Sequence, residues 1–245
     1  MNESVKVTLW NTEWAVPNGR RGQIIQSVLH HGDPELICVT EGFSGIFSMS
    51  GHTITSADDY GYPITQGRRK VLLWSKSPWK EVDQLGSSLM PGGRFISGTT
   101  QSPVGLVRII GVCIPWQDAH VRSGRRNRQP WQDHLSFIAG LDELLPRGEF
   151  DMPTILLGDF NQRIPKGRQP GPVYDCLIQT LQDRLCVVTD GVIGEIGKPS
   201  IDHLVATSHF KASSVTGFSN VANDGTTMSD HFGLRISLGL KSMSE

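Results

Sequence analysis

The stretch Thr154-Ile-Leu-Leu-Gly-Asp-Phe-Asn-Gln162 joins an apolar run to two polar side chains. A short apolar run bounded by glycine, here Gly158, is typical of a buried strand. Asp159 and Asn161 lie two residues apart, so in an extended chain both side chains point to the same side. Asp is an acceptor and a candidate base, and Asn adds an amide that can hold a water or a phosphate oxygen. On its own, Asp-x-Asn after a strand is more often a turn than a site.

Similar polar groups lie at the ends of other expected strands. Asp202-His203 opens one strand and Asp230-His231 opens the last. An acid next to an imidazole can provide a metal ligand, or an orienting group together with a proton carrier. Near the front of the chain, Asn11 and Glu13 follow one strand and Glu41 follows another. Sheet enzymes place their chemistry at strand ends, so these residues are candidates for one site.

The rest of the chain alternates short apolar runs with turn residues. These runs predict eight strands, at Val5–Trp10, Leu36–Thr40, Val71–Ser75, Phe95–Thr99, Leu106–Ile114, Thr154–Leu157, Ile201–Ala206 and Phe232–Leu238. Helical periodicity predicts three helices, at Gly22–His31, Pro130–Leu145 and Pro172–Leu181. This balance indicates a mixed α/β architecture dominated by sheet. The sequence contains no repeat or linker, so we expect a single domain over residues 1–245.

The composition bounds the class of protein. Its 38% hydrophobic and 19% charged residues are those of an ordinary globular protein. A net charge of −1 excludes a globally basic nucleic-acid coat but not a local basic groove. No apolar run reaches the about 18–20 residues that span a bilayer, and the alternating segment Met1–Trp10 does not resemble a secretion signal. The cysteines form no C-x-x-C pair and predict buried, reduced thiols; they are Cys38, Cys113, Cys176 and Cys186. We therefore expect a cytoplasmic protein with no membrane partner and no obligatory protein partner.

The polar motifs and their order resemble those of the endonuclease/exonuclease/phosphatase superfamily, the deoxyribonuclease-I-like and exonuclease-III-like phosphodiesterases. The matching residues are Asn11, Glu41, Gly158-Asp-Phe-Asn161, Ile201-Asp-His203, Ser229-Asp-His231 and a strand start at Gly93-Arg94-Phe95-Ile96. The resemblance extends from about residue 5 to residue 238. It implies an α/β fold in which two packed mixed β-sheets are flanked by helices, a four-layer α/β sandwich with the active site at one end.

The resemblance also implies a metal site. Glu41 would bind a divalent metal with Asn11 and Asp230 close by, and Glu13 would take an outer or second-metal role. Clustered carboxylates repel one another unless a cation lies among them. Oxygen donors without cysteine favour Mg²⁺ or Mn²⁺ over zinc. Such an ion would polarise the phosphoryl oxygens during in-line displacement.

The implied catalytic residues are Asp159, Asn161, His231 and Asp202. Asp159 would align or deprotonate the attacking water, and Asn161 would hold that water or a phosphate oxygen. His231 would contact the scissile phosphate while Asp202 fixes its imidazole. The plainer alternatives are an Asx turn at Asp159 and turn or capping residues at the other positions.

Two stretches depart from the family pattern. Cys113 stands where relatives have a phosphate-contacting Tyr or His, and Trp116 replaces a polar residue. Because a thiol is a poor hydrogen-bond donor, His120 and Arg94 are candidate substitutes. Lys198-Pro199-Ser200 lacks the Trp that abasic-site endonucleases carry near the lesion pocket, which argues against dedicated abasic-site repair.

Basic residues cluster in four loop-like places. The richest cluster contains Arg122, Arg125, Arg126 and Arg128, and Arg163, Lys166 and Arg168 follow the Asp159 motif; the other two are Arg20-Arg21 and Arg68-Arg69-Lys70. On the rim of an active site these arginines would follow a phosphate backbone, and Trp116 could stack on bases. A solvated surface loop is the equal alternative. Trp131 has the helical spacing of a core residue.

Together these features favour a metal-dependent phosphodiesterase, and within that class an endonuclease that hydrolyses DNA or RNA by in-line attack of water. The first alternative is a phosphatase or phosphodiesterase of a small or lipid-derived ester. The second is a non-catalytic binding module on the same fold, which the changes at Cys113 and Trp116 motivate. The choice between DNA and RNA and the number of metals stay open.

Overall fold

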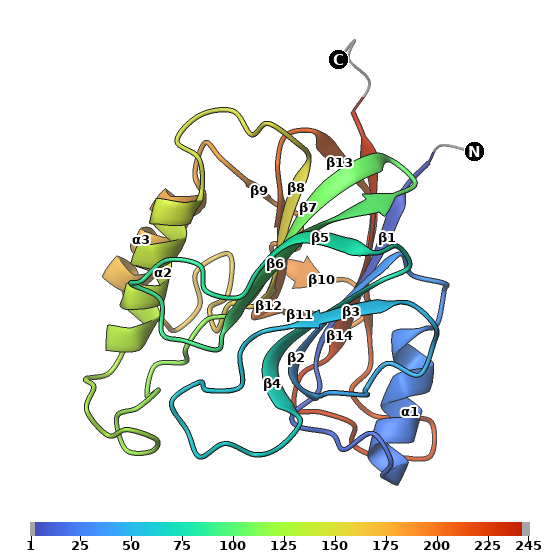
Figure 1. The fold of residues 1–245 in the computed structure, drawn as a ribbon, viewed down its shortest axis with the longest axis horizontal. Coiled ribbons are helices and arrows are strands. Elements are labelled where there is room, and N and C mark those ends of the chain that lie inside the picture. Colours follow the sequence, from blue (N-terminus) through green and yellow to red (C-terminus); the bar gives the residue numbers. More distant parts are fainter. Residues whose placement is uncertain (1–2, 242–245) are drawn as a thin grey trace.

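The computed structural model describes residues 3–241. Two six-stranded sheets pack face to face, and helices cover their outer faces (Figure 1). The first sheet has the order β13 (Phe210–Phe218), β14 (Gly233–Leu240), β1 (Val5–Asn11), β2 (Leu36–Phe43), β4 (Arg68–Ser75) and β3 (His52–Thr55). The second has the order β5 (Trp79–Asp83), β6 (Phe95–Ser102), β7 (Gly105–Cys113), β8 (Thr154–Asp159), β12 (Asp202–Ala206) and β9 (Cys186–Val187). A small ribbon pairs β10 (Val192–Ile193) with β11 (Lys198–Pro199).

Three helices complete the layers. On one side α1 (Arg20–Leu29) covers the first sheet, and on the other α2 (Gln132–Leu144) and α3 (Gly171–Leu181) cover the second (Figure 1). Both sheets are mixed, because β1 and β2 are parallel, as are β7 and β8, whereas the other pairs are antiparallel. The predicted four-layer sandwich is confirmed.

Three apolar layers hold these elements together. Successive strand residues point to opposite faces of a sheet. Accordingly Leu157 packs between the sheets, while its neighbour Leu156 packs against Phe137 and Leu177 of the helices. Central strands are buried on both faces, which explains their continuous apolar runs.

All eight predicted strands and three predicted helices are present, with ends shifted by a few residues. Four of the missed strands, β3, β5, β9 and β13, form the outer edges of the two sheets. An edge strand with one solvated face has no continuous apolar run, and in β13 four successive residues are exposed. The other two are the two-residue strands of the small ribbon.

The prediction that the cysteines are buried is correct for only some of them. Cys38 and Cys113 are buried, Cys176 is half-buried and Cys186 is exposed. The prediction of a buried thiol is therefore wrong for Cys186, which lies on the edge strand β9. Among the helices of residues 3–241, none is long and apolar enough to cross a membrane.

Candidate active site

Polar strand ends from both sheets meet at one edge of the sandwich. Asp159 ends β8 and Asp202 begins β12, and the two are direct cross-strand partners. His231 comes from the segment before β14. One potential ligand atom from each of these three side chains lies within 4.8 Å of the others. We call Asp159, Asp202 and His231 the carboxylate–imidazole cluster.

Backbone geometry places Asp159 at the strand end. Gly158 has φ +143°, and a Cβ there would lie 1.8 Å from the Val112 carbonyl oxygen, so only glycine fits. The Asp159 Oδ1 accepts a bond from the backbone N–H of Asn161 at 2.9 Å, and its Oδ2 accepts one from Asn11 Nδ2 at 3.1 Å. Asn161 itself turns the chain with φ 52°, a conformation that Asn tolerates.

Asp202 orients His231 within the cluster. The imidazole Nδ1–H donates to Asp202 Oδ2 at 2.6 Å. Burial opposes a charge on His231, but the negative charges of Asp202 and Asp159 raise its pKa to about 10. Burial and the charge of Asp202 raise the pKa of Asp159 to about 7. The site therefore concentrates negative charge and leaves the Nε2 side of His231 for another group.

Lys70, which the sequence analysis placed only in a loop-like basic cluster, is buried in strand β4 beside the site, so the prediction of a loop is wrong there. Its Nζ lies 2.5 Å from Glu41 Oε1, in a side chain only 10% exposed. The same ammonium faces the rings of Trp14 at 5.0 Å and Tyr60 at 5.4 Å. Glu41 also contributes to the raised pKa of Asp159, which places both groups near the cluster. The sequence signal that could have identified it is a lysine directly before the apolar run Val71–Ser75, which lies in the strand next to that of Glu41.

The donor set fits a divalent cation. Asp202 Oδ1 is buried and has no hydrogen-bond partner among residues 3–241. Glu41, Asp159 and Asp202 offer oxygen ligands, which suit hard ions such as Mg²⁺ and Mn²⁺. A cation here would offset their mutual repulsion and give the orphaned oxygen a partner.

Three other residues were predicted to bind the metal with Glu41 or to lie close to it. They are Asp230, Glu13 and Asn11, and each has a different environment in the structure. Asp230 has a side chain 67% exposed, with its Oδ1 3.8 Å from His231 Nε2 at the rim. Glu13 pairs with Arg21 at 3.3 Å, outside the cluster. Asn11 uses its amide to support Asp159 and to accept the Glu13 backbone N–H. In this arrangement Asn11 positions Asp159, Glu13 pairs with Arg21, and Asp230 lines a cleft together with Asp202 and His231.

The proposed substitutes for a Tyr or His at Cys113 are both buried. His120 is 4% exposed and its Nδ1–H donates to Asp133. It thereby anchors the loop that carries Arg122, Arg125, Arg126 and Arg128, which we call the arginine loop. Arg94 is 1% exposed and its backbone oxygen accepts the Cys113 N–H. Burial raises the pKa of the Cys113 thiol to about 12, which excludes a thiolate nucleophile at neutral pH.

The arginine loop is only partly free to bind a ligand. Arg128 pairs with Asp133 at 2.6 Å and Arg125 with Asp59 at 3.5 Å. Arg122 and Arg126 are exposed. Trp116 is 45% exposed and is not among the residues that line the two clefts beside the cluster, although its neighbour Gln117 lines one of them.

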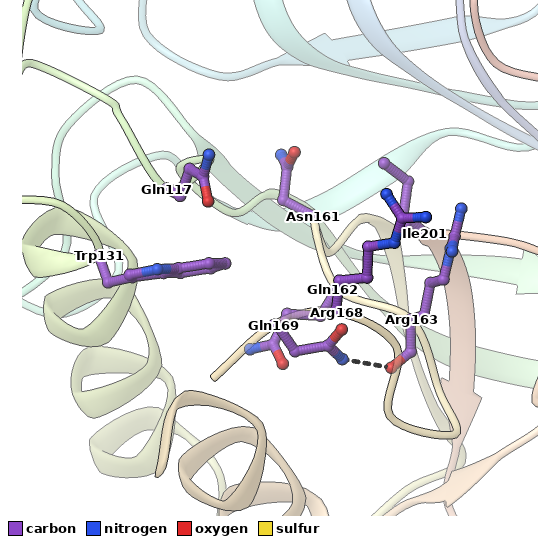
Figure 2. Close-up of a pocket in the computed structure, with 8 residues that line it drawn as sticks. All are labelled: Gln117, Trp131, Asn161, Gln162, Arg163, Arg168, Gln169 and Ile201. Atoms are coloured by element: carbon purple, nitrogen blue, oxygen red, sulfur yellow. Dashed lines mark hydrogen bonds between the residues drawn. The ribbon is translucent and has the colours of Figure 1, made fainter. Parts of the chain in front are cut away.

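These two clefts flank the loop that follows Asp159. The smaller, of about 140 Å³, is lined by Arg163, Lys198, Pro199, Ser200, Ile201, Asp202, Asp230, His231 and Phe232. The larger, of about 420 Å³, is lined by Gln117, Trp131, Asn161, Gln162, Arg163, Arg168, Gln169 and Ile201 (Figure 2). Trp131 was expected in the core; instead it is half-buried and lines this cleft.

A buried histidine supports the loop from behind. His134 Nδ1–H donates to the Pro115 carbonyl at 2.6 Å, so its Nε2 accepts from Gln162 Nε2 at 2.7 Å. Burial lowers the pKa of His134 to about 4 from an ordinary 6.5. Between pH 4 and pH 6.5 the imidazole of His134 therefore binds a proton in the unfolded chain but not in the folded protein.

Acidification is expected to destabilise the fold through His134. The folded pKa is the lower one, so the stabilising contribution is complete above pH 6.5 and is lost as the pH falls toward 4. The loss amounts to at most about 3 kcal/mol. Urea unfolding at pH 7 and pH 4.5 measures the change in the free energy of unfolding. His134→Gln should weaken the dependence of this free energy on pH between the two values. Equal slopes in the two proteins would contradict the assignment.

Comparison with known proteins gives one family and many structures of one fold. The family model described as the endonuclease/exonuclease/phosphatase family matches residues 8–231. Similar solved structures include an AP endonuclease from Archaeoglobus fulgidus, with TM-score 0.64, 14% identity, and coverage of 97% of this chain and 100% of that chain. A 3′ phosphatase from Neisseria bound to a product DNA hairpin has TM-score 0.65 and 18% identity, with coverage of 97% and 100%. Humanized D. rerio TDP2 has TM-score 0.69 and 12% identity, with coverage of 96% and 99%. No curated protein sequence matches significantly.

Proposed function

Because this chain belongs to the endonuclease/exonuclease/phosphatase family, we propose that it is a metal-dependent phosphodiester hydrolase that cuts nucleic acid. The observation that carries the proposal is the carboxylate–imidazole cluster, in which Asp202 orients His231 beside a buried Asp159. A fold that only bound ligands would gain nothing from burying two adjacent carboxylates, since each raises the energy of the other.

Each member of the cluster has a role in hydrolysis. Asp159, held by Asn11 and Asn161, aligns a water and accepts its proton. The imidazolium of His231 donates from Nε2 to a phosphoryl oxygen, since Nδ1 is bound to Asp202. Glu41 and the Asp159–Asp202 pair would hold Mg²⁺ or Mn²⁺, and such an ion would polarise the phosphoryl group and stabilise the charge on the leaving oxygen.

Charge at the rim supports a nucleic-acid substrate over a small ester. Arg163 and Arg168 line the larger cleft, and neither forms an ion pair with any residue in the range 3–241. Free guanidinium groups beside a phosphodiesterase site suit a phosphate backbone. The similar structures also include an AP endonuclease and a phosphatase bound to a DNA hairpin.

A cleavage panel tests the proposal. Supercoiled plasmid, single-stranded DNA and structured RNA are incubated with Mg²⁺ or Mn²⁺, and EDTA is the control. We expect metal-dependent cleavage of at least one member, weakened steeply by added salt. If the protein hydrolyses only small phosphate esters and cuts no nucleic acid, the nuclease proposal is wrong and the small-ester phosphodiesterase replaces it.

Lys70 gives a prediction about the metal. Its ammonium and a divalent cation compete for Glu41, so Lys70→Met is expected to lower the half-saturating Mg²⁺ concentration roughly fivefold, the effect of about 1 kcal/mol. Calorimetric titration of Mg²⁺ measures this without turnover. Lys76→Met removes a similar lysine that pairs with Asp33 and Glu35 away from the site, and serves as the control. Weaker Mg²⁺ binding by Lys70→Met would show that the lysine supports the metal site instead.

A further inference from the structure

The larger cleft, of about 420 Å³, opens directly beside Asn161 (Figure 2). We propose that it binds one unpaired nucleobase of the strand being cut, next to the scissile phosphate. The proposal rests on the proposed function and names the substrate form that the site selects. Its volume falls within the range of ligand pockets and far exceeds what a phosphate alone needs.

Trp131 supplies a flat aromatic wall. Figure 2 shows the ring nearly edge-on, extending from the side of α2, and Gln117 and Gln169 line the same cleft. The backbone N–H of Trp131 donates to the Gln117 carbonyl at 2.7 Å, which fixes the backbone, and the ring meets His134 edge-on with centroids 5.0 Å apart. The backbone has φ 68°, which a bulky residue adopts only when its surroundings impose it. A rigid, half-exposed indole suits stacking on a base of any identity.

Gln162 supplies a polar group with a fixed direction. Its Nε2 donates to His134 Nε2 at 2.7 Å and to the Val173 carbonyl at 3.2 Å. These two bonds hold the amide in one orientation. Its Oε1 is buried and has no partner among residues 3–241, although Gln162 lines the cleft. A buried acceptor without a partner is costly, and the amino group of a base could satisfy it.

Arg163 connects the cleft to the catalytic centre. It lines the larger cleft and also the smaller one, which contains Asp202 and His231. A strand with a phosphate at His231 therefore has Arg163 on its path toward Trp131. A base within a duplex is paired and stacked, so it would have to leave the helix to enter. We infer a preference for single strands, frayed ends or loops.

Binding by the inactive Asp159→Asn protein separates the cleft from catalysis. Fluorescence anisotropy with a labelled single-stranded DNA, the same sequence as a duplex, and the equivalent single-stranded RNA gives the affinity for each form. We expect both single strands to bind more tightly than the duplex. Trp131→Ala should weaken single-strand binding roughly 5- to 150-fold, the range of one base–aromatic stack, and Trp131→Phe should restore part of it. Tighter binding of the duplex, or no effect of Trp131→Ala, would overturn the proposal.

Abasic substitution tests the same point without altering Trp131. Oligonucleotides that lack one base at each position near the scissile phosphate should bind more weakly at one position only, and Trp131→Ala should abolish that difference. Arg168→Ala should weaken all oligonucleotides, whereas Arg147→Ala removes an exposed arginine on another face and should not. Equal affinity for every abasic oligonucleotide would overturn the base site. Metal-dependent cleavage of a nucleic acid by wild type, despite equal affinity for every abasic oligonucleotide, shows that such a failure concerns the cleft, whereas no cleavage of any nucleic acid by wild type means that the proposed function itself fails.

Discussion

Asp159→Asn is expected to lower kcat about 10³-fold, within the roughly 10²–10⁴-fold range of general base catalysis. The side chain is buried beside Asp202 and held by donors from Asn11 and Asn161. Asn keeps the size of the side chain but cannot accept a proton from water. The rate of cleavage of the preferred substrate under saturating Mg²⁺ measures the loss.

Asp183→Asn is a matched control for this variant. Asp183 is exposed, follows α3 and has φ 60°, which Asn tolerates equally. It should retain wild-type kcat. Near-normal cleavage by Asp159→Asn, with the metal dependence unchanged, would remove Asp159 from the reaction.

Asp202→Asn is expected to lose both activity and stability near neutral pH. Without its carboxylate, His231 loses both the partner of Nδ1 and the charge that raises its pKa, so kcat should fall roughly 10²–10⁴-fold. In metal-free buffer the variant also loses the buried ion pair that stabilises the His231 imidazolium in the folded protein. Relief of the repulsion between Asp202 and Asp159 offsets only part of that loss.

Thermal unfolding in EDTA measures the second effect. We expect a lower Tm than wild type in EDTA, and a smaller gain in Tm on adding Mg²⁺. Asp190→Asn, an exposed aspartate near β9, is the control. A variant that is active, or as stable as wild type in EDTA, would contradict the charge balance that we describe for the cluster.

Much of the fold was predictable because the central strands are buried on both faces. Leu36–Thr40 and Thr154–Leu157 read as continuous apolar runs, and turn residues bound them. The edge strand β13 was not predictable, since its exposed residues carry no apolar pattern. Its place in the sheet comes from pairing with β14, which is information about a distant segment.

Residues of the site were predictable where they stand at strand ends. Asp159, Asp202 and His231 were selected because they follow or precede apolar runs, and the structure brings them together. Their roles remain predictions. The sequence could not show that Asp230 points outward, because neighbouring positions such as Asp230 and His231 differ in direction only once the backbone is known.

Contacts between distant loops were beyond sequence reasoning. Lys70 pairs with Glu41 across β2 and β4, and that pairing depends on strand register. Trp131 has the spacing of a core residue, but α2 begins at Gln132, after the left-handed turn that leaves the indole in the cleft. Only the assembled fold distinguishes a helix residue from one that ends a loop.

Cleavage in water enriched in oxygen-18 tests the central claim most directly. The wild-type protein cuts its preferred oligonucleotide with Mg²⁺ in that water, and mass spectrometry reads the new phosphate termini. Hydrolysis by in-line attack of water predicts one oxygen-18 atom in each new terminal phosphate and none in EDTA, where no cut is made. Cleavage without incorporation, or no cleavage with either Mg²⁺ or Mn²⁺, would contradict a water-activating, metal-dependent phosphodiesterase.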